Sequence, residues 1–168
     1  NQHQKACEVG IVSIGANLII GVILSMVMVV CSKYILDFMN TPDEIMNTTV
    51  TYTKIVGSFL FLMAIQPVLS GILRSYGYTK QSMIITLIAN IINILGNALF
   101  IYGLFGAPEL GPIGVAISTV FSRFITVLLI AFIIVRKIDF SFSEQFFKRW
   151  PIQDIKNILK IGVPSALE

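Results

Sequence analysis

Hydrophobic residues along the chain gather into four long stretches, and short polar segments separate them. Each stretch is close to the ~20 residues that an α-helix needs to cross the hydrocarbon core of a bilayer. The pattern therefore predicts an all-α, polytopic membrane helix bundle. The predicted membrane helices cover residues 9–36, 52–73, 82–104 and 113–135.

The polar segments between these stretches set the boundaries of the predicted helices. The sequence Thr-Pro-Asp-Glu at Thr41–Glu44 is typical of a helix start, so the second helix is expected to begin there, at the membrane surface. Gly77 marks a short turn, and the glycines and prolines of residues 103–114 mark a longer one. Residues 136–155 predict a cytoplasmic linker, and residues 156–168 begin a further apolar segment.

Composition excludes a water-soluble domain. Hydrophobic residues make up 55% of the chain, charged residues only 12%, and the mean hydropathy is +0.84. Soluble domains carry about 25% charged residues. The net charge of +3 lies in short loops rather than on a soluble face, so no nucleic-acid partner is expected.

The sequence contains none of the motifs that carry enzyme or cofactor chemistry. There is no HExxH, GxSxG, P-loop or GxGxxG motif, and the single histidine, His3, lies in a polar terminal segment. We therefore predict a protein that is not an enzyme, without catalytic residues, metal ligands or a cofactor.

Charges in the loops predict how the chain is oriented in the bilayer. Basic residues occur before the first helix, in the turn between the second and third, and after the fourth: Lys5, Arg74, Lys80, Arg136 and Lys137. The remaining loops carry Asp37, Asp43, Glu44 and Glu109 and almost no Lys or Arg, apart from Lys33 and Lys54 at helix ends. Lys and Arg remain on the cytoplasmic side during insertion, so both ends of the chain are expected to be cytoplasmic.

The third predicted helix carries three asparagines in an otherwise apolar run. Asn90, Asn93 and Asn97 recur at spacings of three and four residues, which places them on one helical face. Amides in hydrocarbon need partners, so this face is expected to point into the bundle or a wet cavity. Hydrogen bonds between helices and the lining of a substrate or ion pathway are both compatible with this stripe.

The fourth predicted helix carries Arg123 close to its midpoint. A charge there costs at least about 2.5–3.5 kcal/mol on insertion scales, so the guanidinium must be shielded, paired or hydrated. Thr119, Ser122 and Thr126 share its side of the helix. A structural arginine that caps carbonyls of a neighbouring helix and a residue of a transport pathway both remain open. In addition, Gly114, Ser118 and Ser122 form a row of small residues that permits close helix packing.

The second predicted helix contains Gln66 and Pro67 near its middle. Proline removes a backbone donor and frees a carbonyl, so Pro67 predicts a kink or hinge. Broken helices often lie near transporter sites, which makes Gln66 a candidate pathway residue.

Several motifs follow one another in order across residues 71–123. The first is a turn of pattern Arg-x-x-Gly-x-Thr-Lys, formed by Arg74, Gly77, Thr79 and Lys80. The asparagine-rich helix, a Pro-x-Leu-Gly-x-x-Gly segment and a Thr-Val-x-Ser-Arg segment come next. This succession resembles the multidrug and toxic compound extrusion (MATE) family, as do the Thr-Pro-Asp-Glu loop and the terminal GVPSALE.

The resemblance implies part of a six-helix half of a twelve-helix, inverted-V transporter. The chain would cover the third to sixth helices and the start of the seventh, and because it begins with Asn1 rather than Met we expect a fragment. Glu168 would lie where acidic residues of some family members take part in cation coupling. Tyr78 departs from the family, which commonly has Asp at this position of the turn.

The resemblance also implies a function. It is secondary active efflux of amphipathic, often cationic small molecules, driven by a proton or sodium gradient, by a monomer in the bacterial inner membrane. The alternative is a lipid-linked oligosaccharide flippase or polysaccharide exporter of the same superfamily. A flippase is expected to have a more cationic cavity, and Arg123 is the one mid-membrane cation of the predicted helices. A non-transporting scaffold would not need the buried polar stripes.

Overall fold

The computed structural model describes residues 2–137, which are helical apart from short turns and contain no β-strand. The predicted linker and the following apolar segment, including Glu168, lie outside the described residues from residue 138 onward. The elements are α1 (Gln2–Phe38), α2 (Asp43–Ser58), α3 (Leu60–Ser75), α4 (Thr79–Tyr102), a single 3-10 turn η1 (Leu104–Gly106) and α5 (Pro112–Lys137).

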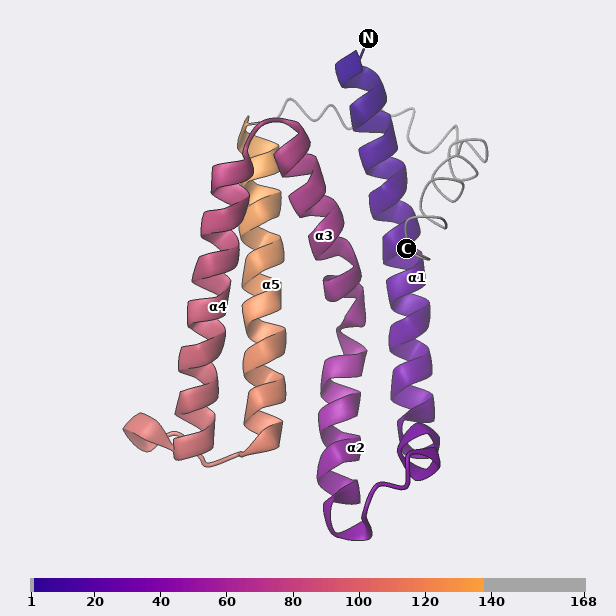
Figure 1. Cartoon of the computed structure of the whole chain (residues 1–168), viewed down its shortest axis with the longest axis vertical. Helices are drawn as coiled ribbons and strands as arrows, with labels where there is room; N and C mark the ends of the chain where they lie inside the picture. The colour runs from indigo at the N-terminus through magenta and orange to yellow at the C-terminus, as the bar shows by residue number, and fades with distance from the viewer. Residues whose placement is uncertain (1, 138–168) are drawn as a thin grey trace.

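In chain order the helices run alternately down and up the bundle, and α3 continues in the direction of α2 (Figure 1). α1 packs along α2 and α3, α4 packs along α5, and α5 also contacts α2 and α3. Leu73 and Ile130 are fully buried where α3, α4 and α5 meet, next to the turn between α3 and α4. This apolar cluster holds the three helices together at one end and positions their polar faces farther along.

Three of the helices are long and apolar enough to cross a membrane, and α2 and α3, bent against each other, are together long and apolar enough for a fourth span. Their outward side chains agree with a lipid environment. Val30, Leu95 and Phe132 are each more than half exposed, and large apolar surfaces of this kind mark contact with lipid or another apolar partner. The described residues thus form the all-helical membrane bundle that the hydrophobic pattern predicts.

The first helix is longer than its apolar stretch. Helix α1 begins at Gln2, whereas the sequence predicted a polar surface segment up to residue 8 and a helix from Val9. Gln, Lys, Ala and Glu are good helix formers, so the polar segment continues the helix although it does not extend the apolar span. That span runs from Ser13 to Phe38.

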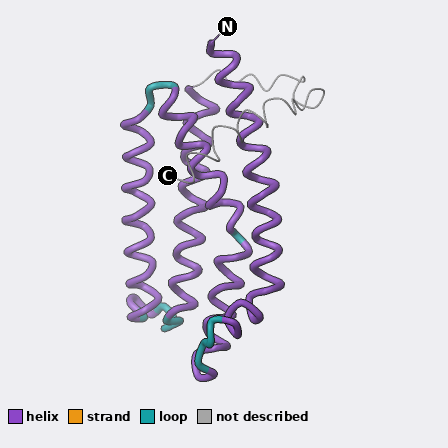
Figure 2. The backbone as a smooth tube through the Cα atoms, turned by 45° about the vertical axis from the view of Figure 1, so that its right-hand side comes forward, coloured by secondary structure: helices purple, strands orange, loops and turns teal. Residues whose placement is uncertain are grey.

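The bend in the second span lies at a different place from the predicted one. α2 and α3 meet at an angle of 42°, and the break falls at Phe59, eight residues before Pro67, which lies inside α3 (Figure 2). Beyond the break, the backbone N–H of Phe61 donates a hydrogen bond to Ser25 Oγ of α1 at 3.3 Å. A Cβ on Gly21 of α1 would lie 2.7 Å from Phe61 Cα. The neighbouring helix therefore fits against the break and binds a donor that the break frees.

The turn between α3 and α4 contains the motif of the sequence analysis. Gly77 has φ of +84°, a left-handed conformation that glycine adopts without strain. Arg74, Thr79 and Lys80 are exposed around it. The hydroxyl of Tyr78, the residue that departs from the family pattern, donates to the backbone carbonyl of Lys137 at 3.4 Å, and the Lys137 ammonium lies 5.6 Å from the centre of the tyrosine ring. Tyr78 thus connects the turn to the end of α5.

Most charges of the connections divide between the two ends of the bundle, whereas Lys33, Lys54 and Arg123 lie within α1, α2 and α5. Figure 1 shows the start of α1, the α3–α4 turn and the end of α5 at one end. The basic residues Arg74, Lys80, Arg136 and Lys137 lie there. The acidic residues Asp37, Asp43, Glu44 and Glu109 lie toward the other end, in and around the α1–α2 and α4–α5 connections. The helical arrangement is compatible with both ends being cytoplasmic, which stays a prediction.

Candidate functional site

The candidate site is built on the close packing of α4 against α5. Gly96 of α4 lies against Ser118 of α5, so near that a Cβ at position 96 would overlap the serine hydroxyl. Gly114 of α5 is packed in the same way on Phe100 of α4. Ser118 and Ser122 are buried along this contact, as the row of small residues predicts. Small residues allow the two backbones to approach, and polar groups can then bond across.

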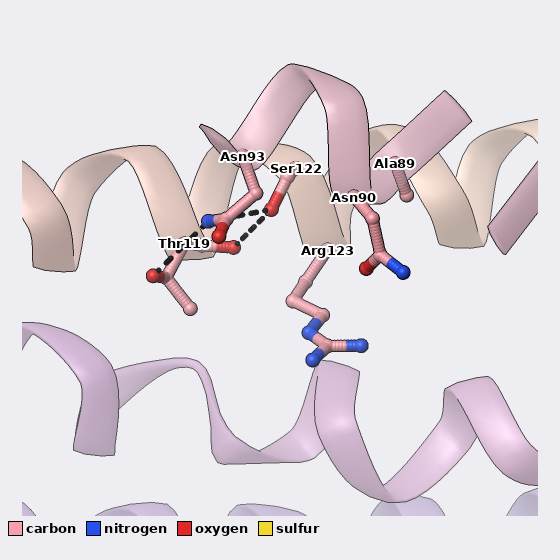
Figure 3. A pocket seen from close by; sticks show the side chains of 6 residues that line it. All are labelled: Ala89, Asn90, Asn93, Thr119, Ser122 and Arg123. Carbon is pink, nitrogen blue, oxygen red and sulfur yellow. Dashed lines mark hydrogen bonds between the residues drawn. The ribbon is translucent and has the colours of Figure 1, made fainter. Parts of the chain in front are cut away.

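Hydrogen bonds cross this contact at mid-helix (Figure 3). The Asn93 amide donates to Thr119 Oγ1 at 3.3 Å and to Ser122 Oγ at 3.4 Å. The Asn97 amide donates to Asn93 Oδ1 at 3.3 Å. Ser118 Oγ donates to the backbone carbonyl of Asn93 at 3.1 Å. Two of the three predicted asparagines therefore bond within the bundle, to α5 or to each other.

Other hydroxyls of α5 bond to their own helix. Ser122 Oγ donates to the Thr119 carbonyl at 2.9 Å, and the buried Thr126 hydroxyl donates to the Ser122 carbonyl at 2.7 Å.

The side-chain oxygen of Asn97 on α4 lacks a hydrogen bond. Asn97 Oδ1 is buried without a hydrogen-bond partner among the described residues. Within the membrane such an oxygen is costly to leave unpaired, so Asn97 has unused capacity to accept.

Arg123 connects α5 to the bent span. Its Nη1 donates to Gln66 Oε1 of α3 at 3.0 Å, and both side chains are half-buried. The sequence pattern indicated Arg123 and Gln66 as two separate candidate pathway residues. In the structure their side chains are hydrogen-bonded although they lie 57 positions apart in the chain. The guanidinium thus bonds to a side-chain amide rather than capping a backbone carbonyl among the described residues.

A small pocket of about 40 Å³ lies between these groups. Its lining consists of Ala89, Asn90, Asn93, Thr119, Ser122 and Arg123. Figure 3 shows Arg123 and Asn90 pointing to the same side, away from the bonded group of Asn93 and Ser122. Asn90 is the most exposed of the three asparagines, because α4 packs chiefly on α5. The pocket is therefore polar and lies within the membrane-spanning part of the helices.

The other candidate residues lie elsewhere. Pro67 is exposed on α3, next to Gln66 in the chain, and the α3–α4 turn with its exposed basic residues lies at one end of the bundle.

The sequence pattern did not predict two contacts between helices. One is that of Gly96 with Ser118, and the other is that of Ser25 with the Phe61 N–H. The recurrence of Gly21, Ser25 and Ser32, all buried, at intervals of four and seven residues was a signal for the second.

The chemistry of this arrangement favours binding rather than bond making. Amides and hydroxyls neither ionise nor attack at neutral pH, and the one charged group, Arg123, carries N–H donors and no acceptor. Such a set of donors and acceptors can hold a polar group inside the membrane, orient it and release it. Charged residues that face the interior of a membrane bundle commonly mark substrate or ion pathways.

Comparisons with known proteins show what this chain is similar to. A family model described as MatE matches residues 1–99. The uncharacterized transporter YisQ of Bacillus subtilis is 38% identical over 167 residues, which cover 99% of this chain and 37% of YisQ. The probable multidrug resistance protein NorM of Thermotoga maritima is 33% identical over 149 residues, which cover 88% of this chain and 32% of that protein.

Solved structures show the same arrangement of helices. A multidrug resistance MATE family transporter of the MOP superfamily in its inward-facing conformation superposes with a TM-score of 0.81 at 26% identity, over 94% of this chain and 35% of that one. The outward-facing conformation of such a transporter gives a TM-score of 0.77 at 27% identity. The chain thus spans about a third of the length of the relatives that it matches.

Proposed function

Because this chain belongs to the MatE family, which is a family of transporters and not of enzymes, we propose that it forms part of a multidrug efflux transporter. Its substrates are amphipathic small molecules, often cationic, that enter from the bilayer or the cytoplasm. Export is secondary active, in exchange for protons or sodium ions that flow inward. The whole transporter acts as a monomer in the bacterial inner membrane.

The observation that carries this proposal is the polar pocket between α4 and α5, whose Arg123 bonds to Gln66 of α3. Arg123, Gln66 and Asn93 place a cation and neutral amides inside the membrane-spanning region, where polar groups are costly unless they serve packing or transport. Packing alone explains Asn93, which bonds to α5. It does not explain why Asn90 and Arg123 line an open polar pocket.

The proposed mechanism follows from the way in which two-halved transporters work. Substrate binds between two bundles, and rocking of one bundle against the other exposes the site first to one side and then to the other. Helices α1–α5 supply most of one bundle in this scheme, and their polar pocket faces the path of the substrate. The bent α2–α3 span adjoins the pocket through Gln66.

An efflux assay tests the proposal. The full-length transporter that carries this chain is expressed in a bacterial host without its own drug exporters, and loss of preloaded ethidium is followed by fluorescence. We expect energy-dependent efflux that stops when an ionophore collapses the proton or the sodium gradient, and the ionophore that stops it identifies the coupling ion. An expressed transporter that exports neither ethidium nor other amphipathic dyes would contradict the proposal.

A further inference from the structure

Arg123 has more hydrogen-bonding capacity than its surroundings use. A guanidinium carries five N–H donors and no acceptor. Among the described residues it makes one hydrogen bond, to Gln66, and no ion pair. The acidic residues whose side chains the structure describes, Asp37, Asp43, Glu44 and Glu109, lie in or near the connections at one end of the bundle. The positive charge of Arg123 is therefore not neutralised within this part of the chain.

The neighbours of Arg123 add donors rather than negative charge. Gln66 directs its amide oxygen at the guanidinium, so its NH2 group remains available to donate. Asn90 contributes a further amide to the lining of the pocket. The pocket thus combines a fixed cation with neutral amides, a combination suited to an anionic oxygen ligand and unsuited to a second cation.

The shape of the guanidinium narrows the choice of ligand. Its planar fork matches a carboxylate, whose two oxygens can accept two parallel N–H bonds. A phosphate or pyrophosphate carries more charge and would call for several cations, whereas Arg123 is the only cation among the described residues that line the pocket. A single carboxylate neutralises one arginine and leaves no residual charge in the membrane.

We propose that Arg123, oriented by Gln66, is a specificity-determining residue that binds the carboxylate of anionic or zwitterionic substrates. This inference rests on the proposed export function and adds to it a substrate class, amphipathic molecules that carry a carboxylate. Purely cationic substrates would be bound elsewhere along the pathway, without contact to Arg123.

Two dyes that differ in a single group provide the test. Tetramethylrhodamine carries a free carboxylate at neutral pH, and its methyl ester has that carboxylate blocked. Binding of each dye to the purified full-length transporter is measured by fluorescence anisotropy. Wild-type protein is expected to bind the acid about tenfold tighter than the ester, as a charge-assisted bidentate contact allows. If the wild-type transporter binds the two dyes equally, or binds the ester more tightly, that result alone overturns the proposal.

Variants locate the preference on the molecule. Arg123→Gln is expected to bring the ratio of acid to ester binding to about one, with the ester affinity changed less than about twofold, and Arg123→Lys is expected to give an intermediate ratio. Arg136→Gln, which removes an arginine from the exposed end of the same helix, should keep the wild-type ratio. If Arg123→Gln binds neither dye, Arg123→Lys decides, and an equal loss of both dyes there overturns the proposal.

The same preparations separate this inference from the proposed function. Selective binding of the acid without gradient-driven efflux of ethidium or of any other amphipathic dye, the acid included, would contradict the exporter and leave the carboxylate contact established. Efflux of ethidium without any preference for the acid would contradict the role of Arg123 and leave the exporter established.

Discussion

The α4–α5 contact and the contact of α1 with α2–α3 both depend on a closely packed glycine, but the close packing has a different consequence in each. Both place a glycine against the neighbouring helix, Gly96 on Ser118 in one and Gly21 on Phe61 in the other. In the first, the close approach brings side-chain amides and hydroxyls within bonding distance. In the second, it lets Ser25 bind a backbone N–H that the break has freed. Small residues therefore allow two helices to pack closely, and the polar groups beside them determine which hydrogen bonds form between the helices.

The largest effect is expected from filling the α4–α5 contact. In Gly96→Ala the new methyl group overlaps Ser118, whose hydroxyl is held by its bond to the Asn93 carbonyl and cannot turn away freely. We expect a loss of about 1–3 kcal/mol in the free energy of unfolding. Thermal unfolding of the purified transporter measures it. Gly71→Ala is the matched control, because nothing lies within 4 Å of a Cβ there.

Removing the polar bonds of the same contact tests its use in transport. Asn93→Leu loses the bonds to Thr119, Ser122 and Asn97, which at membrane-protein values amounts to about 1–2 kcal/mol of stability. It also makes the pocket apolar on one side, so efflux of dye should fall more than in Ile92→Leu. Equal expression and equal efflux in the two variants would show that the asparagines serve packing alone.

A smaller effect is expected at the break of the second span. Ser25→Ala leaves the Phe61 N–H without its acceptor, at a cost of about 1 kcal/mol. Hydrogen exchange of the backbone around Phe59 should become faster, while α4 and α5 keep their protection. Ser75→Ala serves as the control, since that hydroxyl bonds only to the Ile72 carbonyl of its own helix. Unchanged exchange near Phe59 would mean that Ser25 does not stabilise the break.

The smallest effect is expected at the α3–α4 turn. Tyr78→Phe removes a long hydrogen bond to the Lys137 carbonyl but keeps the ring near the ammonium, so stability should change by less than about 0.5 kcal/mol. Tyr78→Ala removes both contacts and should lower stability by about 1 kcal/mol. Thermal unfolding separates the two, and equal effects would place the contribution in the hydroxyl instead.

The fold followed from the sequence more completely than the contacts did. Apolar length predicts each crossing because the bilayer sets it, and Gly77 predicts its turn because few residues adopt that backbone. The break at Phe59 escaped this reasoning because it depends on Ser25 and Gly21 of another helix. A proline, by contrast, favours a kink through its own chemistry, so the sequence predicted the kink at Pro67 instead.

The candidate site shows the same limit. Spacing alone grouped the three asparagines of α4, but it could not tell that Asn93 bonds to α5 while Asn90 stays exposed beside the pocket. Arg123 and Gln66 were each recognised as unusual in a membrane helix. Their pairing depends on how α3 and α5 pack, which no local pattern in either helix encodes.

The break at Phe59 also bears on how the second span fits the thickness of the membrane. Residues 43–75 as one straight helix would be about 50 Å long, against about 30 Å of hydrocarbon. With α3 along the membrane normal, the 42° bend tilts the 16 residues of α2 and lowers their height from about 24 to about 18 Å. The acidic start of α2 at Asp43 and Glu44 is thereby drawn in by about one helical turn, toward the level of the headgroups.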